Sequence, residues 1–114
     1  MPIKISGDTL ALDKAICRQI ENEAKKLALR FPDEQIDALA RINEEFDPLY
    51  GHRVRCELRA NLGQGRQLLV RDARKDAAEA ITEVFGAAKR SMRRLRRRLV
   101  PAAAPGMATS IGAV

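Results

Sequence analysis

Apolar and polar residues alternate at the start of the chain and then change to a helical spacing. Every second residue of segment 2–7 (PIKISG) is apolar, which predicts a short strand that ends in a Gly-Asp turn. From Leu12 to Phe31, apolar residues recur at every third or fourth position, as in an amphipathic helix. Pro32 and Asp33 then predict the end of that helix.

Three segments in the middle of the chain alternate again. Residues 35–46, 52–62 and 66–71 predict three strands, with turns at residues 47–51 and at Gly63-Gln64-Gly65. The apolar sides of the first two segments consist of Ala38, Ala40, Ile42 and Phe46, and of Val54, Cys56, Leu58, Ala60 and Leu62.

One long helix is predicted from Arg74 to Leu99, with Asp72 as its N-cap. Residues 101–114 are small and uncharged and include two prolines, so we expect a disordered tail there. The chain length suits one domain, which we expect over residues 1–100.

The predicted order β-α-β-β-β-α indicates an α+β fold. Consecutive strands joined by short turns must be antiparallel neighbours, so we expect an antiparallel-rich four-stranded sheet with two helices packed on one face. The other face would be exposed to water. It would display Arg41, Arg53 or Arg55, Arg59 and Arg71.

Composition narrows the class of protein. Hydrophobic residues make up 46% of the chain, but no apolar run is long enough to cross a bilayer, and residues 1–12 do not form a signal peptide. Cys17 and Cys56 lack the spacing of a disulfide framework or, with His52, of a metal site. We therefore expect a cytoplasmic protein that has no metal, no cofactor and no membrane segment and acts as a monomer.

No pattern in the sequence predicts an active site. His52, the only histidine, lies in a predicted turn beside Arg53. The Gly63-Gln64-Gly65 segment lacks the Lys-Ser/Thr of a phosphate loop. The acidic run at residues 44–47 has no apolar pocket that would raise a carboxyl pKa. We expect neither an enzyme nor a small-molecule substrate.

Charge is unevenly distributed along the chain, whose net charge is +6. Residues 1–50 contain 7 basic and 10 acidic side chains, whereas residues 51–114 contain 14 basic and 5 acidic ones. In the long predicted helix, the apolar stripe from Ala77 to Leu99 lies opposite seven cations that have no acid among them. These are Lys89, Arg90, Arg93, Arg94, Arg96, Arg97 and Arg98.

Seven like charges on one helix face repel one another, so the pattern favours a polyanion-binding surface over an ordinary solvated face. The first predicted helix adds Lys14, Arg18, Lys25 and, at the margin, Lys26. If the two helices pack side by side, we expect their outer faces to form one basic surface.

The identity of the polyanion is narrowed by what the chain lacks. No helix-turn-helix pattern is present, and the aromatic residues are Tyr50 and three phenylalanines (Phe31, Phe46 and Phe85) that we expect in the core. Folded RNA recognised by shape and phosphate needs neither feature. Membrane binding is disfavoured because the apolar stripe continues back to Ala77 at core spacing.

The chain resembles the ribosome hibernation promoting factor family, also called ribosome-associated inhibitors, protein Y or sigma-54 modulation proteins. The resemblance covers about residues 2–98. It rests on the opening strand PIKISG, the β-α-β-β-β-α order, and the segment from Asp76 to Ile81 (DAAEAI) followed by a basic helix end. Asp76, Ala80 and Ile81 match the family's D-x-Y-A-A-I-D-like stretch, whereas Ala78 and Thr82 depart from it.

Further positions of the long helix bear on the same resemblance. Arg90, Arg94, Arg96 and Arg98 fall where the family tends to carry Lys or Arg. Ala87 falls where a lysine is frequent in the family.

The resemblance implies a stress or stationary-phase protein that binds the small ribosomal subunit and its ribosomal RNA. Such proteins occupy the channel shared by messenger RNA and transfer RNA and so inhibit translation. We expect the second domain of long family members, which joins two ribosomes, to be absent here. Two alternatives stay open: a general structured-RNA or DNA-binding module, and a regulatory protein whose basic helix docks on an acidic protein partner.

Overall fold

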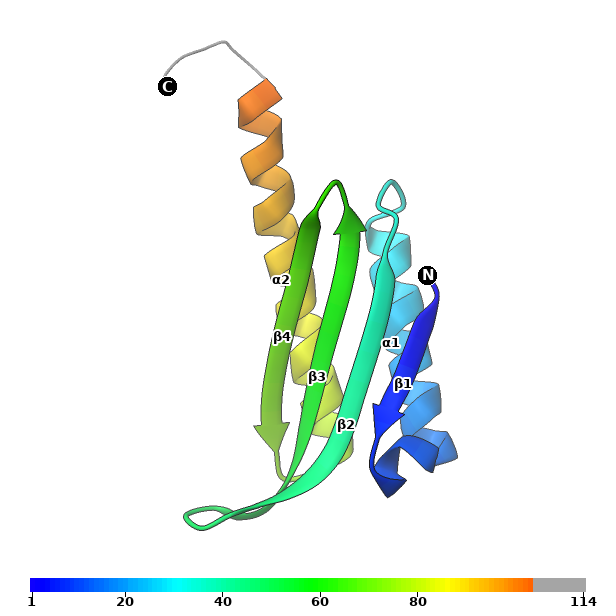
Figure 1. Ribbon diagram of the computed structural model, residues 1–114, viewed down its shortest axis with the longest axis vertical. Coiled ribbons are helices and arrows are strands. Elements are labelled where there is room, and N and C mark those ends of the chain that lie inside the picture. Colours follow the sequence, from blue (N-terminus) through cyan, green and yellow to red (C-terminus); the bar gives the residue numbers. More distant parts are fainter. Residues whose placement is uncertain (104–114) are drawn as a thin grey trace.

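The computed structural model describes the backbone of residues 1–103 and the side chains of residues 1–96. It contains four strands, two α-helices and one short 3-10 helix, arranged as an α+β fold (Figure 1). The elements follow the chain as β1 (Ile3–Gly7), η1 (Thr9–Leu12), α1 (Lys14–Arg30), β2 (Asp37–Asp47), β3 (Gly51–Gly63), β4 (Arg66–Arg74) and α2 (Ala77–Ala103). This order confirms the predicted β-α-β-β-β-α arrangement.

The four strands form one sheet in the order β1-β2-β3-β4. β1 runs parallel to β2, because α1 carries the chain back to the starting end of the sheet before β2 begins. β2, β3 and β4 are antiparallel neighbours joined by two hairpins, as predicted. The register places Ile42 beside Cys56 and Arg41 beside Glu57, so the residues of each pair share a face of the sheet.

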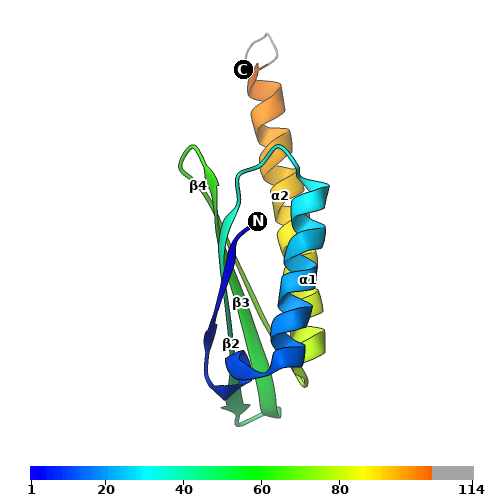
Figure 2. The same ribbon diagram turned by 90° about the vertical axis from the view of Figure 1, so that its right-hand side faces the viewer.

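Both helices cover the same face of the sheet and lie side by side (Figure 2). The core lies between them and the apolar side of the strands, and Ile20, Ile42, Leu58, Ile81 and Val84 are its largest fully buried aliphatic side chains. Cys56 points into this core, as its place in the alternation predicts. Burying an aliphatic side chain of this size contributes about 1.5–3 kcal/mol, so the core accounts for much of the fold's stability.

The helix predicted over Leu12–Phe31 is confirmed as α1, which begins at Lys14, while Leu12 ends the preceding η1. Asp8 accepts a hydrogen bond from the Leu10 backbone N–H at the start of η1, and Asp13 accepts from the N–H groups of Ala15 and Ile16 at the start of α1. Each aspartate therefore caps its own helix, and the backbone at Asp13 is extended rather than helical.

The prediction that Asp72 caps the last helix is wrong. Asp72 lies inside β4, opposite Cys56, and its carboxylate pairs with Arg74. The cap is Asp76, whose carboxylate accepts from the Glu79 N–H at 2.8 Å. Asp72 and Asp76 both precede the helical spacing, but β4 continues to Arg74 and leaves only Asp76 at the boundary.

The last helix also differs from its predicted range of Arg74–Leu99. It begins at Ala77 and continues to Ala103. Its last two residues are alanines, which are strong helix formers. Residues 104–114, which hold most of the predicted tail, lie outside the part of the chain that the structure describes.

Phe46 was predicted on the core side of β2, and this is wrong, since its side chain is 77% exposed. The alternation along β2 assigns Phe46 to the same side as Ile42, but β2 and β3 extend beyond the beginnings of α1 and α2 (Figure 1). The inner side of a strand is buried only where a helix covers it, and no helix covers the end of this hairpin.

Candidate nucleic-acid interface

The cations of α2 occupy several directions around the helix. Arg90, Arg93 and Arg94 are exposed, whereas Lys89 and Arg96 are half-buried. Lys89 lines a groove against α1, and Arg94 borders β4 near Leu69. Arg97 and Arg98 continue the basic sequence, and their side chains lie outside the described residues. The buried residues of α2 (Ala80, Ile81, Val84, Phe85, Ala88 and Met92) confirm the predicted apolar stripe up to that point.

The cations of α1 divide into two groups. Lys14, Arg18 and Lys25 are exposed. At about 100° per residue, these three lie on the side of α1 that turns away from α2. Gln19, Glu23 and Lys26 lie on a different side of the helix. Gln19 marks the side facing α2, because its amide donates to the Ala78 carbonyl at 3.0 Å. Lys26 and Arg30 lie on this second side.

A groove of about 290 Å³ runs between α1 and α2. It brings together Lys26 and Arg30 from α1 and Lys89 from α2, over a floor that includes Gly86. Glu23 also lines the groove and pairs with Lys26, at 3.4 Å between the carboxylate oxygen and Nζ. Three cations against one acid leave the groove net positive, which suits a phosphate group.

The half-buried Arg96 makes two contacts within the molecule. Its guanidinium pairs with Asp33 at 3.1 Å and lies over the Phe31 ring, 5.7 Å from the centroid. Arg96 thereby connects α2 to the segment that follows α1. Because Asp33 is 82% exposed, water screens this ion pair, and it contributes little to stability.

The open face of the sheet carries the arginines predicted there. The register places Arg41, Arg53, Arg55, Arg59 and Arg71 on this face, so both Arg53 and Arg55 belong to it. Acids are interspersed: Arg55 pairs with Glu45 at 2.8 Å, and Glu57 lies between Arg41 and Arg71 in the register. The sheet face therefore mixes charges more than the basic end of α2 does.

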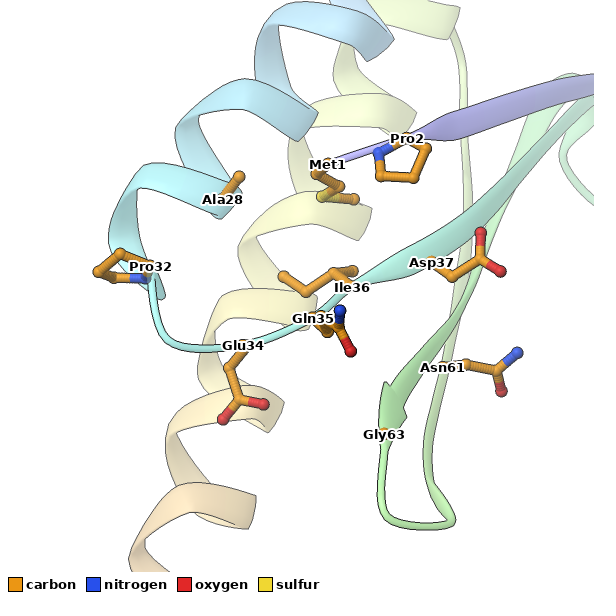
Figure 3. A pocket seen from close by; sticks show the side chains of 10 residues that line it. All are labelled: Met1, Pro2, Ala28, Pro32, Glu34, Gln35, Ile36, Asp37, Asn61 and Gly63. Carbon is orange, nitrogen blue, oxygen red and sulfur yellow. The ribbon is translucent and has the colours of Figure 1, made fainter.

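A cavity of about 530 Å³ does not fit a phosphate ligand. It lies between the start of the chain, the end of α1 and the start of β2 (Figure 3). Its polar side chains are Glu34, Gln35, Asp37 and Asn61, without a lysine or arginine, and Glu34 is already paired with Arg66 at 2.9 Å. This cavity therefore adds no basic side chain to those on the helices.

Other kinds of site find little support among the described residues. Burial raises the pKa of the Cys56 thiol to about 12, so Cys56 is not a thiolate nucleophile near neutral pH. No group of three or more His, Cys, Asp and Glu side chains within residues 1–96 is placed to hold a metal ion. Within residues 1–103, no helix is long and apolar enough to cross a membrane.

The sequence prediction missed Arg30 as a member of the basic surface. Its signal was present, because Arg30 follows Glu23 and Lys26 at helical spacing and therefore shares their side of α1. The side of α1 that faces α2 could be identified only from the contact between Gln19 and Ala78.

The sequence profile of a family described as "Sigma 54 modulation protein / S30EA ribosomal protein" matches residues 3–100. The N-terminal domain of Protein Y from Thermus thermophilus is similar in structure, with 22% identity and a TM-score of 0.65, covering 83% of this chain and 99% of that one. A ribosomal subunit interface protein from Coxiella burnetii has 10% identity and a TM-score of 0.65, covering 85% and 99%. At these identities, the two structures share the fold. Among curated proteins, none matches the chain.

Proposed function

Because the chain belongs to the sigma 54 modulation protein / S30EA ribosomal protein family, we propose that it binds the small ribosomal subunit and inhibits translation. It occupies the channel shared by messenger RNA and transfer RNA, under stress or in stationary phase. The names of the family and of one structural neighbour refer to the ribosome and to its subunit interface.

The observation that carries this proposal is the basic surface on the two helices. It consists of exposed arginines on α2, a groove with cations from both helices, and further exposed cations on α1. Arginine and lysine on a rigid surface can bind the phosphates of folded RNA without reading base edges. The proposed contacts are Lys14, Arg18, Lys25, Lys26, Arg30, Lys89, Arg90, Arg93, Arg94, Arg96, Arg97 and Arg98.

Inhibition by this route requires no chemical step. A folded domain held by phosphate contacts in the channel excludes messenger RNA and transfer RNA by its volume alone. Residues 1–100 are proposed to act as the ribosome-binding domain, as a monomer in the cytoplasm and without a cofactor.

Charge reversal on the two faces of the molecule tests the assignment of the surface. The double variant Arg90→Glu/Arg93→Glu changes the helix face, and Arg41→Glu/Arg71→Glu makes the same change of charge on the sheet face. Affinity for purified small subunits would be measured by co-sedimentation at several salt concentrations, with circular dichroism as a check of folding.

Each phosphate contact contributes about one unit to the slope of log affinity against log salt. The helix-face variant should therefore bind more weakly, with a slope shallower by about two, whereas the sheet-face variant should keep the wild-type slope. Equal losses from both variants would contradict the helix-face assignment. Wild-type protein that fails to sediment with small subunits would contradict ribosome binding, and RNA or an acidic protein would then be the partner to test.

A further inference from the structure

Three large apolar side chains are exposed at the tip of the β2–β3 hairpin. Phe46 is 77% exposed, Leu49 84% and Tyr50 68%. The hairpin continues beyond the beginnings of both helices (Figure 1), so its end stands free of the two-layered core. Exposed clusters of apolar side chains commonly mark binding sites.

The hairpin tip, residues 46–50, is held in a defined conformation. The Asp47 carboxylate accepts hydrogen bonds from the backbone N–H groups of Leu49 at 2.7 Å and Tyr50 at 3.1 Å. The Arg53 guanidinium lies over the Tyr50 ring, 5.3 Å from its centroid, and also donates to the Ala73 carbonyl. Asp47 thus holds the backbone at Tyr50, and Arg53 contacts one face of the Tyr50 ring.

The acids next to the hairpin tip are occupied by internal partners. Glu44 lies 2.7 Å from the His52 ring nitrogen, and Glu45 forms two hydrogen bonds with Arg55. The bonds from Arg55 hold the pKa of Glu45 below its usual range. Arg53 adds a positive charge beside the Tyr50 ring, whereas Asp47 keeps its negative charge at the tip, so the positive charge that a nucleic acid meets here is the guanidinium next to Tyr50.

The size and chemistry of the tip favour a nucleobase over a protein partner. Three side chains of 150–250 Å² each, exposed to this degree, offer roughly 400–500 Å², below the ~800 Å² per partner of a stable protein interface. An aromatic ring next to an arginine is the combination on which unpaired bases stack.

We propose that the hairpin tip binds an unpaired nucleobase of RNA by stacking on Tyr50, with Phe46 and Leu49 providing apolar contact beside it. This inference rests on the proposed function, in which RNA is the partner. It adds a base contact to a surface otherwise built for phosphates.

Tyr50 is the only tyrosine in the chain, so full-length protein labelled with 3-fluorotyrosine gives one ¹⁹F resonance. A short single-stranded oligoadenylate should shift this resonance, whereas inorganic polyphosphate, which has charge but no bases, should not. Equal shifts with both ligands, or no shift with saturating oligoadenylate, would overturn base stacking. A shift that follows protein concentration alone would instead identify a second copy of the chain as the occupant.

Variants test the same contact on the ribosome. Tyr50→Ala should weaken binding to purified small subunits by about 5- to 150-fold, while Tyr50→Phe should bind within about twofold of wild type. Leu39→Ala is the control, because Leu39 is 37% exposed but lies on the open face of the sheet, outside the proposed contacts. If Tyr50→Ala binds as wild type does while Arg90→Glu/Arg93→Glu fails to bind, the hairpin-tip proposal is wrong and the proposed function stands.

Discussion

Gly7 ends β1 at a point where no other residue fits the backbone. Its φ of +140° is accessible almost only to glycine. A Cβ at this position would overlap the carbonyl oxygen of Ile42, the residue opposite it in β2. The close approach of the two strands therefore depends on a missing side chain.

Replacing Gly7 with alanine should lower the free energy of unfolding by at least about 1–3 kcal/mol, from backbone strain and the clash with Ile42. The control is Gly65→Ala, where φ is +74° but nothing lies near the added Cβ. That change should cost only about 1 kcal/mol. Urea denaturation measures both values, and equal losses would show that the approach of β1 to β2 is not restrictive.

Asp8 connects β1 to β2 through its carboxylate. One oxygen accepts from the Glu44 N–H at 2.7 Å, and the other accepts from the Leu10 N–H at 2.9 Å. These bonds lower the pKa of Asp8, the Glu44 bond most of all. A carboxylate whose pKa falls on folding stabilises the protein above its unfolded pKa, and this contribution is lost as pH falls through the folded value.

The variant Asp8→Asn, which keeps only one acceptor oxygen, should have a lower melting temperature than wild type at pH 7. The difference should shrink as pH falls below about 4, since Asp8 becomes protonated in both states of the wild type. Thermal melts from pH 7 to pH 2 measure this. A difference that stays constant over that range would exclude a role for the Asp8 charge.

Single residues also show where the sequence stops being informative. Phe46 lies on the core side of β2 by its place in the alternation, but it stays exposed because the hairpin extends beyond the beginnings of α1 and α2. Asp72 has the correct chemistry for an N-cap, but the pairing of β4 with β3 extends past it. Both outcomes depend on where neighbouring elements end, and no local pattern records that.

The groove between α1 and α2 combines cations with one opposing acid. Glu23 pairs with Lys26 within the groove and is itself only 23% exposed. An RNA phosphate that enters the groove must compete with this carboxylate for Lys26. Glu23 therefore weakens RNA binding in the proposed function.

The variant Glu23→Gln should raise affinity for small subunits by about two- to fivefold, because an exposed pair of this kind is worth up to about 1 kcal/mol. Glu57→Gln removes the same charge from the open face of the sheet, away from the groove, and should have a smaller effect. Co-sedimentation measures both. Equal gains from the two variants would mean that only net charge matters and that the groove has no special role.

The sequence predicted the helices and strands better than it predicted the candidate site. Strict alternation in residues 52–62 and the apolar stripe of α2 reflect burial on one side, which the sheet and helix geometry confirm. The candidate site was less predictable. Lys26 meets Lys89 in the groove whereas Lys14, Arg18 and Lys25 turn away, and this separation follows from how α1 packs on α2.

At the scale of the whole molecule, two proposed RNA contacts lie at opposite ends of the sheet. The hairpin tip is at one end, and the basic half of α2 extends toward and past the other (Figure 1). A ligand that reaches both must be large. The small subunit meets this requirement, whereas a short oligonucleotide would engage one end at a time.

Competition on the small subunit tests the central claim, occupation of the decoding channel, most directly. Small subunits are loaded with the protein, messenger RNA and initiator transfer RNA are added, and the bound components are followed by sedimentation. The protein should leave the subunit as the two RNAs bind, and Arg90→Glu/Arg93→Glu should fail to inhibit translation in an extract. A stable complex that holds the protein, messenger RNA and transfer RNA together would contradict the account.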